Sequence, residues 1–377
     1  MTFFFYSVVI TTWWLAITLY LLIKGKTIAF LKAQPLAGAQ PSVAIIIAVR
    51  NEEDDLEKAL QSVCNLSYSN YRIIVLNDRS TDCTPEILAT FLTHYPQLEV
   101  IHIKDLPQGW LGKNHALYQG YLNSNEEWLL FTDADVEFHP NALSKAMVYV
   151  DKNKLDHLTI LPEIVSTSAL LNSMLGTFTL LFMMQFRPWA ASKPKSKASI
   201  GIGAFNLVRR EAYERAGTHQ LIKLRPDDDL KLGNLIKAAG FRQDVLVGKG
   251  YVGLEWYKNV PEFVNGLMKN SFAVSGYSLL KTLLGITFIL LFIALPVPLM
   301  LLFGTNTIRL MACLILVFQA AYMATPVLPN KWWHALTIPL GGFLLAYITA
   351  RSAFITLKQK GIYWRESFYP LDMLKGN

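Results

Sequence analysis

Two short groups of carboxylates contain the residues most able to do chemistry. Residues 133–135 read Asp-Ala-Asp, and residues 227–229 are three consecutive aspartates. An Asp-x-Asp turn can hold a divalent cation on a diphosphate, and a second acidic group can supply a base that takes a proton from a hydroxyl. Ordinary turn formation is the alternative for the first group, and a capped helix start after Pro226 is the alternative for the second.

The segments before these groups predict the scaffold that positions them. Residues 43–49 form a continuous β-prone run, typical of a parallel strand buried on both faces, and further strands are expected at 72–76, 98–103 and 127–131. A helix is expected to open at residues 51–55 and another near Pro85. This alternation predicts an α/β fold with a mostly parallel sheet, whose acidic turns lie at the strand carboxyl ends, where open sheets bind ligands.

The ends of the chain predict membrane segments. Of the 377 residues 52% are hydrophobic, and the mean hydropathy is +0.29. An uncharged apolar run predicts a transmembrane anchor at residues 1–25, and the lysines at 24, 26 and 32 place the following domain, 42–277, in the cytoplasm. Apolar runs at 283–303, 308–328 and 335–355 predict a second transmembrane region at 281–357, followed by a basic tail at 358–377.

Two of these apolar runs are not expected to cross the bilayer. Three full C-terminal spans would put the basic tail on the side opposite the domain at 42–277. Positive residues favour the cytoplasmic side, so we expect the run after Trp332, which contains Pro339, to be re-entrant or interfacial. Residues 164–186 are long enough to span, but spanning would separate Asp135 from Asp229. We therefore expect an interfacial helix at 164–191, with the lysines at 193, 195 and 197 among the lipid headgroups; a buried core helix is the alternative.

Charge and cysteine usage narrow the partners and the compartment. A net charge of +7 and a pI near 9.1 suit an anionic membrane surface or an anionic substrate. No nucleic-acid-binding signature is present, so we expect no nucleic-acid partner. The three cysteines are few and far apart, which indicates a reducing compartment rather than a disulfide framework.

Taken together, the motifs resemble the family 2 inverting glycosyltransferases, which have the GT-A fold, and especially the membrane-anchored branch that acts on carotenoid, hopanoid and sphingolipid acceptors. The resemblance covers roughly residues 42 to 275. It depends on the order and spacing of five segments: Ala-Val-Arg-Asn-Glu-Glu at 48–53, Asn-Asp-Arg-Ser-Thr-Asp-Cys-Thr at 77–84, Gly-Trp-Leu-Gly-Lys-Asn at 109–114, Asp-Ala-Asp at 133–135 and Asp-Asp-Leu-Lys-Leu-Gly at 228–233.

The resemblance implies roles for individual residues on the donor side. Glu53 and Asp78 would hold the uridine of a UDP-sugar, and Lys113 would lie near the nucleotide. Asp133 would approach the ribose or the sugar, and Asp135 would bind the Mn²⁺ or Mg²⁺ that bridges the diphosphate. The chain departs from the family pattern at position 77, where an asparagine replaces the usual first aspartate.

On the acceptor side the resemblance makes Asp229 the catalytic base, beside Asp228, which stands where the family usually has glutamate. Residues 200–210 resemble the glycine-bearing strand that floors the acceptor site. The usual Gly-Gly before His219 is Gly217-Thr218 here, and a lone histidine at that place is more often structural. Near the C-terminus, Tyr363-Trp364-Arg365 resembles a Trp-Arg-Gly motif, with Glu366 in place of the glycine. Arg365 would bind diphosphate if the tail is cytoplasmic, and would be only an interfacial anchor if it is not.

These features predict an enzyme of the plasma membrane with several spans. It would transfer a sugar, with UDP-glucose the favoured donor, to a lipid such as a carotenoid, hopanoid or sphingolipid, with inversion at the sugar. Residues 230–280 lack the Gln-x-x-Arg-Trp motif of processive polysaccharide synthases, which disfavours polymer synthesis. The alternatives are transfer to a polyprenyl phosphate, and a non-catalytic membrane scaffold or lipid-handling protein whose acidic groups are only turns and caps.

Overall fold

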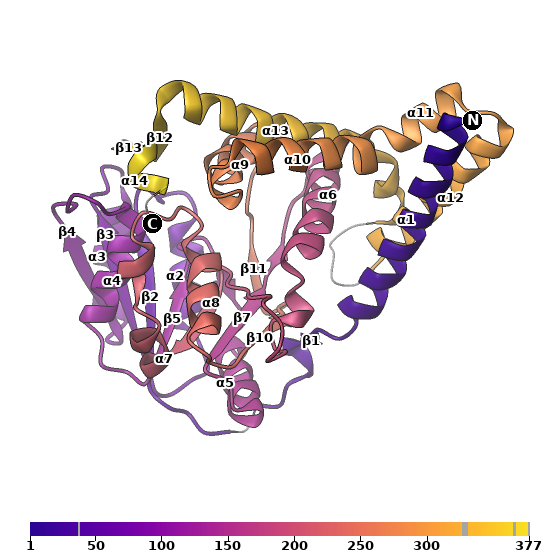
Figure 1. Cartoon of the computed structure of the whole chain (residues 1–377). Coiled ribbons are helices and arrows are strands. Elements are labelled where there is room, and N and C mark those ends of the chain that lie inside the picture. The colour runs from indigo at the N-terminus through magenta and orange to yellow at the C-terminus, as the bar shows by residue number, and fades with distance from the viewer. Residues whose placement is uncertain (37, 326–330, 365–366, 376–377) are drawn as a thin grey trace. The chain divides into compact units, whose positions relative to one another are not determined.

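The computed structural model (Figure 1) describes the chain except for residues 37, 326–330, 365–366 and 376–377. The described residues divide into two compact units. Residues 28–165 and 187–256 form one, which we call the sheet unit, and residues 1–27, 166–186 and 257–375 form the other, which we call the helical unit. Each is described by itself.

An eight-stranded sheet forms the centre of the sheet unit. Its strand order is β1-β10-β7-β9-β5-β2-β3-β4. Strand β9 runs antiparallel to β5 and β7, and the other pairs in this sheet are parallel, which confirms the predicted mostly parallel α/β fold. The strands are β1 (Ala29–Phe30), β2 (Val43–Val49), β3 (Tyr71–Asp78), β4 (Leu98–Ile103), β5 (Trp128–Thr132), β7 (His157–Leu161), β9 (Asn206–Arg209) and β10 (Gln243–Val247).

Apolar clusters on both faces bury this sheet, which explains why its central strands read as unbroken apolar runs. Side chains of α2 (Leu56–Cys64), α3 (Thr84–His94) and α5 (Ala142–Asn153) pack on one face. Those of α4 (Gly112–Leu122), α7 (Arg210–Arg215) and α8 (Asp228–Ala238) pack on the other. A small second sheet joins β6 (Glu137–Phe138), β11 (Val252–Leu254) and β8 (Glu163–Ile164) in that order.

One predicted helix boundary in this unit is wrong. Residues 51–55 do not open a helix, and α2 begins at Leu56 instead. Asn51 has a φ of 54°, which a right-handed helix does not accept, and its backbone N–H donates to the Ser80 hydroxyl at 3.0 Å. The acidic loop after β2 is therefore bonded to the loop after β3 rather than wound into a helix.

The helical unit contains the apolar segments. Figure 1 shows α10 (Leu279–Phe288) running beside part of α13 (Ile338–Gln359), and the two helices are in contact. Residues 2–25, 169–190, 306–323 and 332–359 are long and apolar enough to span a membrane, and α10 with α11 forms a further candidate bent by 46°. The elements are α1 (Thr2–Gly25), α6 (Ala169–Phe186), α9 (Val260–Val274), α10 (Leu279–Phe288), α11 (Pro296–Phe303), α12 (Asn306–Met323), α13 (Ile338–Gln359), β12 (Gly361–Trp364), β13 (Ser367–Pro370) and α14 (Leu371–Lys375).

The bend falls inside the predicted segment 283–303. A π-helical turn at Ile289–Ala294 connects α10 to α11, and Pro296 has no N–H to offer the carbonyl of Phe292 four residues earlier. The Trp14 indole donates to that carbonyl at 3.1 Å, and the Tyr6 hydroxyl donates to the carbonyl of Leu291 at 2.7 Å. Side chains of α1 thus satisfy carbonyls that would be costly to leave unpaired in lipid.

The residues that made the last apolar run look weak do not break its helix. Pro339 lies in the first turn of α13, where a missing N–H costs nothing. A Cβ on Gly341 would lie 2.4 Å from the Thr177 hydroxyl of α6, so this glycine permits close helix contact. Strand β8 occupies residues 163–164, and α6 begins only at Ala169. How α6 and α13 lie in a bilayer stays a prediction.

Candidate active site

The sheet unit gathers the predicted site residues at one edge of its main sheet. The side chains come from the loops and helix starts that follow β2, β3 and β5, together with the first turns of α4 and α8. Of the predicted residues, only Arg365 lies outside the described part of the chain. The predicted site residues that the structure describes are Glu53, Asp78, Lys113, Asp133, Asp135, Asp228 and Asp229.

Asp78, at the end of β3, is held by cations from its own neighbourhood. Its side chain is buried, and the Arg79 guanidinium donates to both carboxylate oxygens at 2.8 and 3.1 Å. Arg50 adds an ion pair at 3.9 Å. A Cβ on Gly112 would lie only 2.3 Å from Asp78 Oδ2, so the Gly-Lys segment of α4 approaches Asp78 through a residue without a side chain.

Glu53, in the loop after β2, binds the loop after β3. Its Oε2 accepts a hydrogen bond from the Cys83 backbone N–H at 2.9 Å, and its own N–H donates to Asp82 Oδ2 at 3.1 Å. Asn77, which replaces the usual aspartate, is buried and donates to Nδ1 of His102 at 3.1 Å. We call this region, residues 50–53 and 77–84, the nucleotide turn.

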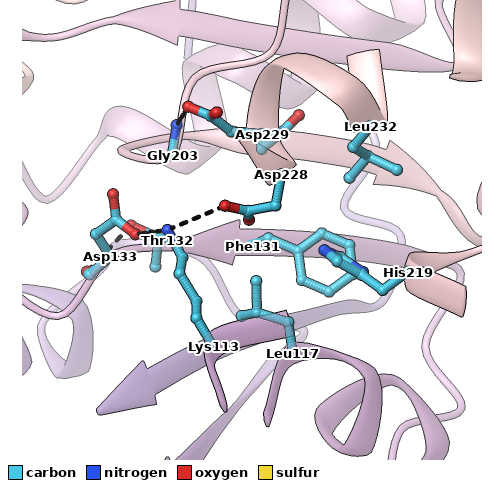
Figure 2. A pocket seen from close by; sticks show the side chains of 11 residues that line it. Lys113, Leu117, Phe131, Thr132, Asp133, Gly203, His219, Asp228, Asp229 and Leu232 are labelled. Carbon is cyan, nitrogen blue, oxygen red and sulfur yellow. Dashed lines mark hydrogen bonds and ion pairs between the residues drawn. The ribbon is translucent and has the colours of Figure 1, made fainter. Parts of the chain in front are cut away.

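Lys113 joins the two acidic groups (Figure 2). Its Nζ lies 2.5 Å from Asp133 Oδ1 and 3.9 Å from Asp228 Oδ1. Burial alone would lower the pKa of this ammonium, but the charges of Asp133, Asp228 and Asp229 raise it above its ordinary value. The lysine was predicted only to lie near the nucleotide, and its position between the two groups is a finding of the structure.

Gly203 connects the same two groups through its backbone. Its N–H donates to Asp229 Oδ2 at 2.8 Å, and its carbonyl accepts from the Asp133 N–H at 3.1 Å. The Leu230 N–H donates to the other oxygen of Asp229 at 2.7 Å, which fixes this carboxylate at the start of α8. A Cβ on Gly203 would lie 2.4 Å from Asp133 Oδ2. The prediction of a strand over 200–210 is wrong in its first half, because β9 begins at Asn206 and the glycines precede it.

Asp227, the first of the three consecutive aspartates, has a structural partner. The Arg225 guanidinium donates to both of its oxygens at 2.8 and 2.9 Å, and both side chains are about 6% exposed. A bidentate pair of this kind orients the loop before α8. Asp228 and Asp229 remain for chemistry. Nothing in the sequence had indicated this role for Arg225.

Asn114 also holds the site in place, a role that the sequence did not indicate although the residue lies in the 109–114 segment. The buried Asn114 amide donates to the carbonyls of Ile222 and Arg225, both at 2.9 Å. The Leu111 N–H donates to the carbonyl of Lys223 at 2.8 Å. The start of α4, which carries Lys113, is thereby bound to the loop that leads to Asp228. The adjacent Gly-Lys pair was the only signal for this contact.

The acidic groups create a site suited to a cation. Burial, and then the charges of Asp133 and Glu52, raise the pKa of Asp135 to about 7. Burial also raises the pKa of Asp228 to about 7, against the lowering effect of Lys113, and it raises the pKa of Asp229. Such clustering is unfavourable unless positive charge compensates it. Among the described residues no group of three His, Cys, Asp or Glu side chains could hold a metal by itself, so phosphate oxygens would have to complete the coordination.

A pocket with about 240 Å³ of open space lies between these groups. Figure 2 shows the carboxylates of Asp228 and Asp229 on one side of it and Lys113 with Asp133 on another. Leu117, Phe131 and Leu232 form an apolar part of its lining next to His219. The lining residues are Lys113, Leu117, Phe131, Thr132, Asp133, Gly203, Asn206, His219, Asp228, Asp229 and Leu232.

The sheet order and the acidic turns at its carboxyl edge define a GT-A-type domain. The backbone is similar to that of the mannosyltransferase PcManGT from Pyrobaculum calidifontis, which was solved in complex with GDP-Man and Mn²⁺. The TM-score is 0.55 and the identity 17%, over 94% of this chain and 99% of that one. Residues 44–217 match the sequence profile of glycosyl transferase family 2. The domain over residues 44–217 is therefore a family 2 glycosyl transferase domain.

Two curated relatives have names that concern lipids and carotenoids. The beta-monoglucosyldiacylglycerol synthase of Nostoc sp. is 27% identical over 199 residues, which are 52% of this chain and 41% of that protein. The 4,4'-diaponeurosporenoate glycosyltransferase of Staphylococcus aureus is 25% identical over 230 residues, 60% of each chain. The chain therefore spans about two fifths and three fifths of the lengths of these relatives. The match to this family favours an enzyme over the scaffold alternative.

Proposed function

We propose that this glycosyltransferase transfers the sugar of a UDP-sugar, UDP-glucose in the first instance, to a lipid of the membrane that holds it, with inversion at the sugar. The observation that carries this proposal is the joining of a donor-side acidic turn to an acceptor-side acidic turn through Lys113 and Gly203. Candidate membrane spans in the same chain, and relatives named for a glucosylated diacylglycerol and a glycosylated carotenoid acid, support a lipid acceptor.

The residues divide the reaction between them. Glu53 and Asp78 hold the uridine in the nucleotide turn, and Asp133 with Lys113 approaches the sugar and the diphosphate. Asp229 takes the proton of the acceptor hydroxyl while the hydroxyl oxygen attacks C1 of the sugar. At the same time the bond from C1 to the diphosphate breaks. The Gly203 and Leu230 N–H groups keep the Asp229 carboxylate oriented for this step. An α-linked donor gives a β-glycoside.

Asp135, beside Asp133 and Glu52, is the residue proposed to hold Mn²⁺ or Mg²⁺. Its environment fits a cation, because burial and neighbouring negative charge disfavour the bare carboxylate. A bound ion would neutralise the charge that develops on the leaving diphosphate. The chain supplies few ligands, which agrees with a metal bound mostly by its substrate.

The proposed location is the plasma membrane, with the sheet unit in the cytoplasm. The supporting observation is the lysines at the end of α1 and just after it, because positive residues favour the cytoplasmic side. Cys83 is exposed in the sheet unit and offers a test. A membrane-impermeant maleimide should label Cys83 in inverted vesicles and leave it unlabelled in intact cells, with a Cys83→Ser variant as the background. Labelling in intact cells would contradict this topology.

The test of the activity is product identification. Membranes that contain the full chain are incubated with labelled UDP-glucose, and the lipid products are identified by mass. We expect a glucosylated neutral lipid, with carotenoids, hopanoids, sphingolipids and diacylglycerol as the acceptors to supply. A labelled polyprenyl phosphate would show instead that the acceptor is the polyprenyl phosphate of the alternative function. No labelled lipid from UDP-glucose or any other UDP-sugar would refute the proposal.

A further inference from the structure

His219 is a polar group in the part of the pocket that the proposed mechanism does not use. Its side chain is 1% exposed, and it lines the pocket together with Lys113 and Asp228. The edge of its ring packs on Phe131, with centroids 5.0 Å apart and planes at 74°. Figure 2 shows the ring beside Phe131, in the same pocket as the Asp228 carboxylate. A histidine with only a structural role would need no access to the pocket.

Tyr213 determines which nitrogen of His219 carries the proton. The Tyr213 hydroxyl oxygen accepts a hydrogen bond from the His219 backbone N–H at 3.1 Å, and among the described residues its own proton has no acceptor other than His219 Nδ1. The hydroxyl oxygen lies 2.7 Å from His219 Nδ1, so the hydroxyl donates a hydrogen bond to this nitrogen. A neutral imidazole has one donor and one acceptor nitrogen, so the proton of His219 is on Nε2. Burial, and then the charge of Lys113, lower the pKa of His219 to about 3, which keeps the ring neutral.

The Nε2–H group is thus a donor on a ring that lines the pocket. Among the described residues, no side chain or carbonyl accepts a hydrogen bond from it. The neighbouring wall, formed by Leu117, Phe131 and Leu232, is apolar. A donor beside this apolar wall is poorly hydrated, so an oxygen that enters from the pocket would be favoured there.

The backbone before His219 is strained in a way that fixes this ring. Thr218 has a φ of 60° and a ψ of −170°, a region that is essentially reserved for glycine and costs about 1–3 kcal/mol for other residues. Its N–H is bonded to the Tyr213 carbonyl at 3.1 Å, and its hydroxyl accepts from the Gln220 N–H at 3.2 Å. The turn therefore keeps the shape expected of Gly-Gly although the chain has threonine.

We propose that His219 determines donor specificity: its Nε2–H donates to one hydroxyl oxygen of the sugar being transferred. This inference depends on the proposed function. The sugar is favoured over the acceptor lipid because Asp133 and Lys113, the donor-side residues, line the same pocket. The space is also smaller than a usual ligand pocket, so only a small polar part of a ligand can enter. The Asp228 carboxylate can accept the proton of the same hydroxyl.

The experiment compares UDP-glucose with its 2-, 3-, 4- and 6-deoxy analogues on membranes that contain the full chain and supply the lipid acceptor, with UDP release as the readout. The wild type should use one analogue about tenfold less well, because a neutral hydrogen bond contributes about a factor of ten. His219→Asn keeps a partner for Tyr213 but removes the pocket donor, and it should lose this discrimination. His219→Gln, whose amide nitrogen reaches the position of Nε2, should keep most of it.

Two further measurements separate this role from a structural one. The ratio of the Kd for UDP to the Kd for UDP-glucose should fall about tenfold in His219→Asn, while the Kd for UDP itself stays constant. Thr218→Gly keeps His219 and should keep the analogue profile. An unchanged profile in His219→Asn, or equal weakening of UDP and UDP-glucose, would overturn the inference while the proposed function stands. If the wild type binds UDP and UDP-glucose with the same Kd and releases no UDP from UDP-glucose, both this inference and the proposed function would be wrong.

Discussion

The carboxylates of the nucleotide turn and those of the pocket between the two acidic groups differ in how their charge is compensated. In the nucleotide turn, Asp78 is neutralised by Arg79 and Arg50, and Glu53 accepts a backbone N–H. In the pocket, Asp133, Asp228 and Asp229 share Lys113 as their near cation. Burial raises the pKa of Asp228, and that of Asp135 beside the pocket, to about 7. The first region is shaped by partners within the chain. The second keeps negative charge that a ligand must compensate, so substitutions there should affect chemistry most.

The largest effect is expected for Asp229→Asn. Loss of the base should lower kcat about 10²- to 10⁴-fold, because general base catalysis contributes about that much. UDP binding should be unchanged, as Asp229 is bonded to Gly203 and Leu230 rather than to the nucleotide turn. Asp227→Asn is the matched control, since Asp227 pairs with Arg225: it should lower stability and leave the kcat of the folded enzyme nearly intact.

The measurements for this pair are single-turnover transfer and calorimetric UDP binding. Full activity in Asp229→Asn with a hydroxyl acceptor would disprove the base assignment. A carboxylic acid acceptor is a separate case, because it is already ionised at neutral pH and needs little help from a base. Ester-forming and ether-forming reactions should therefore differ in their sensitivity to this substitution.

The next effect in size is expected for Gly203→Ala. The added Cβ would lie 2.4 Å from Asp133 Oδ2, so Asp133 or the Gly203 backbone must move, and Asp229 loses its fixed N–H partner. We expect kcat to fall about 10- to 100-fold, as misplacement of a reacting group by about 1 Å costs up to that much. Gly253→Ala is the control, because its Cβ would meet only the Glu163 carbonyl at 3.5 Å, an ordinary contact. Equal rates for both variants would show that the link through Gly203 is unimportant.

A smaller effect is expected for Asp135→Ala, and it should appear in metal dependence. UDP binding measured with and without Mn²⁺ or Mg²⁺ should differ strongly in the wild type and little in the variant. Removal of the metal by a chelator should therefore weaken UDP binding about tenfold or more in the wild type and change it little in the variant. If Asp135→Ala keeps a full metal effect, the ion is held elsewhere, with Asp133 or Glu52 as the next residues to test.

Sequence alone predicted the sheet and the edge that carries the site, because strand periodicity and the residues at strand ends are local properties. It placed Asp229 and Asp133 in the right turns. It could not show that Lys113 joins the two groups or that Asn114 binds the loop before Asp228, since these contacts connect residues about a hundred positions apart. It misread the glycines at 201 and 203 as strand, because a loop that passes close to two carboxylates has the same composition as a bulged strand.

The smallest catalytic effect is expected for Asp78→Asn, which tests whether the nucleotide turn acts in binding rather than in the chemistry. Asparagine keeps an oxygen that can accept from Arg79 but removes the charge that balances Arg79 and Arg50. We expect UDP binding to weaken about three- to tenfold, with kcat changed by no more than about twofold, because Asp78 contacts cations within the chain and not the reacting atoms. Initial rates over a range of UDP-sugar concentrations separate KM from kcat. A fall in kcat as deep as that of Asp229→Asn would mean that the nucleotide turn also takes part in the chemistry, and that charge compensation does not distinguish the two regions.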